Sequence, residues 1–126
     1  MILIIGYPNA GKTTYSAQFD NVLHLDDFPP SKFLNCNEAV RQAKSEVVVE
    51  GIYNLRCRRM KLLEAVKKDE KKVCIWLNTP IEECIKRENR GRPRQVVIGP
   101  FQPPTLDEGW DEIIVVDGAR LRKKLL

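Results

Sequence analysis

Residues 2–14 read Ile-Leu-Ile-Ile-Gly-Tyr-Pro-Asn-Ala-Gly-Lys-Thr-Thr, and this stretch decides the fold. Its first four residues form a continuous apolar run rich in β-branched side chains, which is typical of a strand buried on both faces. The run stops at Gly6 and continues as Gly-x-x-x-x-Gly-Lys-Thr over positions 6–13, the Walker A pattern. A buried strand, such a loop and a following helix together predict a phosphate-binding βα unit.

Each residue type in this loop has a physical role in holding a nucleoside triphosphate. The glycines allow backbone amides to approach phosphate oxygens, Lys12 reaches the β- and γ-phosphates, and the Thr13 hydroxyl is a ligand for Mg²⁺. Thr14 is placed to add one more phosphate contact. We therefore expect ATP and Mg²⁺ as cofactors. The residues expected to bind the nucleotide are Gly6, Tyr7, Pro8, Asn9, Ala10, Gly11, Lys12, Thr13 and Thr14.

The rest of the chain alternates between short apolar runs and helical patterns. Strands are expected at 2–5, 22–25, 47–50, 73–77 and 113–116, and helices at 12–19, 35–44, 55–70 and about 80–88. Asn35 and Thr79 are the expected caps of the second and fourth helices. This alternation predicts a five-stranded parallel sheet joined by right-handed crossovers. The expected fold class is α/β, a three-layer phosphate-loop NTPase fold of the kinase type with an arginine-rich lid.

Length and composition narrow the class of protein. The chain has 126 residues and a net charge of +4, so we expect one domain over residues 1–126, with a lid at about 87–104. No apolar run reaches the roughly 18 residues that cross a bilayer, and no basic leader precedes the first apolar residues. We expect a cytoplasmic protein without a membrane partner. The four cysteines form no C-x-x-C pair, so we expect reduced thiols.

Carboxylates follow two of the predicted strands. Asp26 and Asp27 come directly after the second strand, where a carboxylate can orient an acceptor hydroxyl and take its proton. Asp26 is the favoured base, Asp27 is the alternative, and both could instead be turn residues before Pro29. Glu50 ends the third strand, where it could hold a magnesium-bound water, act as the base itself, or form a structural ion pair. The expected metal ligands are Thr13 and Glu50.

A basic segment, Lys-Arg-Glu-Asn-Arg-Gly-Arg-Pro-Arg at positions 86–94, follows the fourth helix. Arginines carried by a closing lid neutralise charge on a transferring phosphoryl group. Arg87 and Arg90 are the favoured catalytic arginines, beside Lys12 and Asp26. The alternative is a solvated basic loop or a contact for nucleic acid without a catalytic part.

These residues together resemble a known family. The loop, Asp26-Asp27, the arginine-rich segment and Phe-Gln-Pro-Pro-Thr-Leu-Asp-Glu-Gly-Trp at 101–110 are similar to the polynucleotide 5′-hydroxyl kinase group of phage type. The resemblance implies ATP as donor, magnesium, Asp26 as the base, catalytic lid arginines, the 5′-hydroxyl of a nucleic acid as acceptor, and a location in the host cytoplasm. It also implies that Phe101 and Trp110 frame the adenine, although both could simply cover the sheet.

The sequence departs from that group at the acceptor side. Leu25 stands where the group usually has arginine, and residues 25–28 and 49–52 look more like uridine kinase and related small-molecule kinases. A nucleoside or nucleotide is therefore the alternative acceptor, and a nucleotide-dependent binding module without acceptor turnover is the second alternative. Arg56, Arg58, Arg59 and Lys61 either follow a phosphate backbone or form the solvated face of a helix. His24 is expected to be a packed or hydrogen-bonded neighbour of the site.

Overall fold

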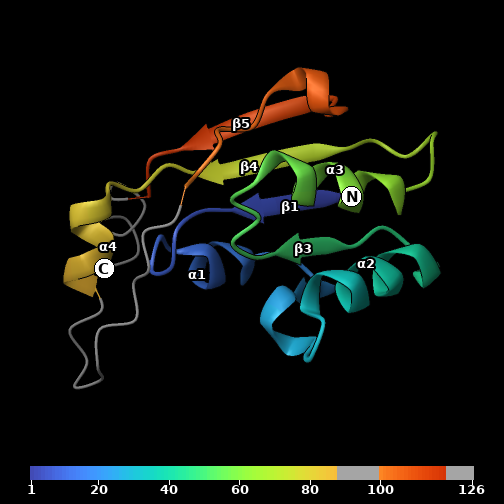
Figure 1. The fold of residues 1–126 in the computed structure, drawn as a ribbon, viewed down its shortest axis with the longest axis horizontal. Coiled ribbons are helices and arrows are strands. Elements are labelled where there is room, and N and C mark those ends of the chain that lie inside the picture. Colours follow the sequence, from blue (N-terminus) through green and yellow to red (C-terminus); the bar gives the residue numbers. More distant parts are fainter. Residues whose placement is uncertain (88–99, 119–126) are drawn as a thin grey trace.

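The computed structural model describes residues 1–87 and 100–118. Five strands form one sheet in the order β2-β3-β1-β4-β5, and every neighbouring pair is parallel. Figure 1 shows the arrows of β1, β3, β4 and β5 pointing the same way, and β2 pairs in parallel with β3, so the carboxyl ends of the strands share one edge of the sheet. The strands are β1 (Ile2–Ile5), β2 (Val22–His24), β3 (Val48–Glu50), β4 (Val73–Leu77) and β5 (Glu112–Val116). The predicted parallel sheet is confirmed, with each strand within a residue of its expected bounds.

Helices cover both faces of this sheet because its central strands are apolar on both sides. Leu3 and Ile5 of β1 pack in one cluster with Cys36 of α2 (Lys32–Gln42) and Leu62 of α3 (Arg56–Glu64). Ile4 points to the opposite face, where the second cluster includes Cys84 of α4 (Ile81–Arg87) and Tyr15 of α1 (Lys12–Ser16). The alternation of neighbouring residues between two cores produces three layers, helix on sheet on helix.

The helix ends differ from the expected ones for local reasons. Helix α1 ends at Ser16, whose hydroxyl donates to the Thr13 carbonyl at 3.0 Å, instead of continuing to residue 19. Helix α2 begins at Lys32 after Ser31, and Asn35 lies inside it, with its amide donating to the Phe28 carbonyl at 3.1 Å. The prediction of Asn35 as the cap is therefore wrong. Helix α3 ends at Glu64, because the Ala65 amide closes the last turn onto the Leu62 carbonyl.

Two short 3₁₀ turns complete the elements, η1 (Leu25–Asp27) and η2 (Leu106–Glu108). Thr105 and Glu108 form a capping box at η2, in which each side chain binds the other's backbone amide.

The four cysteines are all free thiols, as predicted, and only Cys57 is exposed. No helix in the described part of the chain is long and apolar enough to cross a membrane.

Candidate functional site

The Gly6–Thr13 loop leaves the central strand of the sheet and turns back tightly on itself. The Ala10 amide donates to the Tyr7 carbonyl at 3.0 Å, and the chain passes through positive φ at Asn9 (65°) and Gly11 (106°). Gly11 supplies a backbone conformation that L side chains rarely adopt. Gly6 is needed for space, because a Cβ there would lie 3.0 Å from Ala10 Cβ and 3.1 Å from the Leu77 carbonyl oxygen. The two motif glycines therefore serve different purposes.

Lys12 curls back over this loop. Its ammonium donates to the carbonyls of Gly6 at 3.0 Å and Tyr7 at 2.8 Å. Burial lowers the pKa of Lys12, and the carboxylates of Glu50 and Asp26 act in the opposite direction. The two acids therefore lie close enough to Lys12 for their charges to act on it. An anion placed between the loop and Lys12 would gain both the ammonium and the loop amides.

Three strand ends meet around the carboxylate of Glu50. The register places Ile4 of β1 opposite Glu50, and Glu50 opposite His24 of β2. The Thr13 hydroxyl donates to Glu50 Oε1 at 3.1 Å, and His24 Nδ1 lies 3.3 Å from the same oxygen. His24 is thus a neighbour of the site, as predicted. Glu50 is buried, so the hydroxyl and the imidazole are polar partners for a carboxylate that is mostly out of water.

The pair of Thr13 and Glu50 suits magnesium in the manner of nucleotide sites. Mg²⁺ commonly takes one or two protein oxygens and completes its shell with phosphate oxygens and water. A hydroxyl and a carboxylate 3.1 Å apart can serve one such ion. Within residues 1–87 and 100–118 no group of three or more His, Cys, Asp or Glu side chains is arranged around a common point.

Asp26 stands at the open side of the same edge. It belongs to η1, and its carboxylate is 87% exposed, with Lys32 Nζ 2.9 Å from Oδ1. Such an exposed pair is worth about 1 kcal/mol or less, so Lys32 can leave Asp26 at little cost. Asp27 is also exposed, but it is Asp26 that acts on the pKa of Lys12. Of the two aspartates, Asp26 is therefore the one whose charge acts on Lys12 of the loop.

Arg87 lies at the end of α4 and reaches the loop from the other side. Its two terminal nitrogens donate to the carbonyls of Asn9 and Gly118, each at 3.0 Å, while Nε donates to Glu83 at 3.3 Å. Arg87 therefore braces the Gly6–Thr13 loop against the segment that follows β5. Arg90 and residues 88–99 of the expected lid lie outside the described residues, so the lid and its catalytic arginines stay predictions.

Sequence reasoning missed a second brace on this loop. Thr79, expected as a helix cap, is buried, and its hydroxyl donates to the Ala10 carbonyl at 2.8 Å. The two residues are separated by 69 positions, and no local pattern connects them.

The basic side chains of α3 divide into three environments. Arg59 is fully buried in an ion pair with Glu108, so for Arg59 both expected roles, backbone contact and solvated face, are wrong. Arg56 pairs with the exposed Asp107 at 3.0 Å. Arg58 lies over the Phe33 ring, with its guanidinium carbon 4.2 Å from the ring centroid. One helix thus combines a structural arginine with an arginine that faces solvent.

The aromatic residues expected near the adenine are divided as well. Trp110 is only 5% exposed and its indole donates to Glu108 at 3.0 Å, so it belongs to the core and its proposed contact with a base is wrong. Phe101 is half-buried, stacks on Trp76 with centroids 5.6 Å apart, and lies 5.2 Å from the ring of Tyr7 in the loop. Phe101 therefore lies beside the Gly6–Thr13 loop, and its contact with the adenine stays a prediction.

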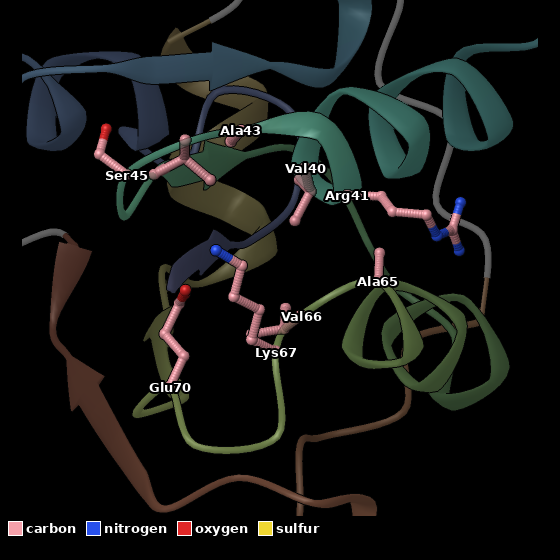
Figure 2. A pocket seen from close by; sticks show the side chains of 9 residues that line it. Val40, Arg41, Ala43, Ser45, Ala65, Val66, Lys67 and Glu70 are labelled. Atoms are coloured by element: carbon pink, nitrogen blue, oxygen red, sulfur yellow. The ribbon is translucent and has the colours of Figure 1, made fainter.

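A small hollow lies at the opposite edge of the sheet. It lies between the ends of α2 and α3 next to Val47, just before β3 begins, and Figure 2 shows its lining side chains. It has room for about one water molecule. The chemically active groups therefore gather at the carboxyl edge, where ligands of parallel sheets bind.

The chain matches no protein-family model and no curated protein sequence. The case for function therefore depends on the residues themselves.

Proposed function

We propose that the protein is an ATP-dependent kinase that transfers the γ-phosphate to the 5′-hydroxyl of a nucleic acid. The observation that carries this proposal is the convergence at one sheet edge. The Walker A loop, Thr13 bonded to the strand-end Glu50, and an exposed Asp26 acting on Lys12 are brought together from three strand ends.

Lys12 and the loop amides are the groups that would hold the triphosphate. In the nucleotide-bound protein, phosphate oxygens replace the Gly6 and Tyr7 carbonyls as partners of Lys12. Thr13 and Glu50 would hold Mg²⁺, which neutralises charge on the β- and γ-phosphates. Arg87 keeps the loop in shape through the Asn9 carbonyl.

Asp26 would act on the acceptor. Its carboxylate accepts the hydroxyl proton as the acceptor oxygen bonds to the γ-phosphorus, and the bond from that phosphorus to the bridging oxygen of ADP breaks. ADP leaves with the electron pair of the broken bond, and the proton passes from Asp26 to water after product release. The step needs no oxidant or further reactant.

The open position of Asp26 favours the end of a polymer over an enclosed small molecule. A carboxylate that is 87% exposed can be reached by a strand whose remaining length stays in solvent. A kinase for free nucleosides encloses its acceptor more completely, because a small ligand gains most of its binding energy from burial. In the described part of the chain, η1 and α2 leave the Asp26 carboxylate exposed and do not enclose it.

The test is transfer from γ-labelled ATP with magnesium to a 5′-hydroxyl oligonucleotide and, separately, to mixed nucleosides and nucleotides. Lys12→Ala and Asp26→Asn are the informative variants, and Lys44→Ala is a surface control outside the site. We expect label on the oligonucleotide with the wild type and Lys44→Ala, and its loss in the other two variants.

Two other results would redirect the assignment. Label only on the small molecules would replace the polymer acceptor with a nucleoside or nucleotide. ATP binding without any transfer, unchanged by Asp26→Asn, would identify a nucleotide-dependent binding module.

A further inference from the structure

Three side chains follow one another in a chain of contacts from Asp26 to α3. Lys32 Nζ lies 2.9 Å from Asp26 and 5.9 Å from the Phe33 centroid, and Arg58 lies 4.2 Å over the same ring. We call Lys32, Phe33 and Arg58 the Phe33 platform. The platform is formed by residues from two helices, and it connects the candidate base to an exposed guanidinium.

The Phe33 ring at the centre of the platform packs against a buried aromatic side chain. Phe33 meets the fully buried Tyr53 edge to face, with centroids 5.2 Å apart and planes at 89°. Phe33 itself is half-buried and packs against the core, while Arg58 is exposed. The guanidinium therefore rests on a fixed aromatic surface and turns its outer side to solvent.

The guanidinium N–H groups of Arg58 are unpaired in the described part of the chain, unlike those of Arg56 and Arg59. Arg56 donates to the carboxylate of Asp107, and Arg59 donates to that of Glu108. Among residues 1–87 and 100–118, no hydrogen-bond or ion-pair acceptor lies on the Arg58 guanidinium, which contacts the Phe33 ring. A guanidinium stacked on an aromatic ring offers a flat face for a base and free N–H groups for a phosphate.

We infer that the Phe33 platform binds the first nucleotides of a single-stranded nucleic-acid acceptor whose 5′-hydroxyl lies at Asp26. This inference rests on the proposed function and assigns the direction of the strand, from Asp26 at its 5′ end toward α3. Lys32 exchanges Asp26 for a phosphate when the strand binds, which frees the carboxylate for the hydroxyl. Arg58 then binds the following nucleotide by stacking and by charge.

The experiment measures binding directly, so that it does not depend on catalysis. A 3′-fluorescent, 5′-hydroxyl oligonucleotide of about six nucleotides is titrated with protein at about 50 to 200 mM salt, and anisotropy is recorded. The variants are Arg58→Ala, Arg58→Lys and Arg41→Ala. Arg41 is the matched control, because it is an exposed arginine on α2 that lines the hollow at the opposite edge of the sheet.

We expect Arg58→Ala to weaken binding of the oligonucleotide about tenfold. The slope of log affinity against log salt concentration, called the salt slope below, should become shallower by about one, as the loss of one phosphate contact predicts. Arg58→Lys keeps the charge but loses the planar stack, so its salt slope stays while its affinity falls. Arg41→Ala stays within about twofold of the wild type. In the kinase assay, Arg58→Ala raises KM for the oligonucleotide and leaves KM for ATP unchanged.

The possible results separate this inference from the proposed function. Equal binding by Arg58→Ala and Arg41→Ala, or no binding by the wild type, would overturn the platform, even if phosphate transfer is normal. Binding that depends on Arg58 without phosphate transfer would keep the platform and overturn the kinase. If polyglutamate displaced the oligonucleotide as readily as unlabelled DNA does, the surface would bind any polyanion, and the Phe33 platform would again be overturned. Urea midpoints equal to the wild type are required of each variant, and Arg58→Lys remains informative if Arg58→Ala fails to fold.

Discussion

The ion pair between Arg59 and Glu108 is buried, so its two charges depend on each other for compensation. Both side chains are fully buried, and two N–H groups of Arg59 donate to the two Glu108 oxygens at 2.8 Å each. Arg59 also donates to the Tyr53 carbonyl at 2.9 Å, and Trp110 donates to Glu108 at 3.0 Å. The pair thereby ties α3 to η2 and to the chain leading into β5.

Removing one partner leaves the other charge buried without compensation. For such pairs the loss is about 3–5 kcal/mol, a large share of the roughly 5–15 kcal/mol by which a domain is stable. We therefore expect Arg59→Ala to lower the free energy of unfolding by about 3–5 kcal/mol. Replacing both charges, as in Arg59→Met with Glu108→Leu, removes the charge problem and should recover most of that loss.

Urea unfolding followed by the fluorescence of Trp76 and Trp110 measures these effects. Arg56→Ala is the matched control, because it removes the same atoms from the same helix but breaks a pair with the exposed Asp107. We expect only a small shift of the urea midpoint for Arg56→Ala, since water screens that pair. An Arg59→Ala midpoint equal to that of Arg56→Ala, or a double variant no better than Arg59→Ala, would refute the reasoning.

Three further predictions concern pH, the thiols and the loop. Burial alone raises the pKa of Glu108, but hydrogen bonds from Arg59 and Trp110 outweigh it and lower that pKa below the usual 4.5. Its contribution to stability is therefore present above about pH 4.5 and is lost as the pH falls through the lowered folded value. The urea midpoint of the wild type should fall with pH in this range, and it should fall less in the Arg59→Met, Glu108→Leu protein, where Asp107 and Glu38, whose pKa values are also lowered, still contribute. Cys57 is exposed, whereas burial raises the pKa of Cys36, Cys74 and Cys84. A thiol reagent should therefore modify Cys57 quickly in the folded protein and the other three cysteines only in urea. Fast modification of a second cysteine in the folded protein would contradict this burial. A Cβ at Gly118 would overlap the Thr79 hydroxyl and lie 2.8 Å from the Ala10 carbonyl oxygen, so Gly118→Ala should displace the loop. An overpacking cost of about 1–3 kcal/mol corresponds to a loss of about tenfold or more in ATP affinity by titration calorimetry. Thr79→Ser keeps the hydroxyl and should bind ATP as the wild type does.

The strands and the loop were predictable because both are written in neighbouring residues. An apolar run such as 2–5 indicates a buried strand whatever surrounds it, and the spacing of Gly6, Gly11 and Lys12 defines the loop. Strand-end acids could be expected at one edge because parallel strands end together, and the contacts of Glu50 with Thr13 and His24 follow that expectation. Helix ends were less predictable, because α1 and α3 stop at local turns that propensity does not encode.

The partners of side chains distant along the chain were decided only by the tertiary structure. The four arginines and lysines at 56–61 look alike in sequence, yet Arg59 meets Glu108 across 49 positions and Arg58 meets Phe33. Thr79 reads as a cap until packing places it against Ala10. The sequence by itself determined an α/β chain with a Walker A loop, because periodicity and motif spacing are local properties. Strand order, and the choice between a buried, a paired and an exposed arginine, depend on which helix packs on which strand, and that is a property of the folded whole.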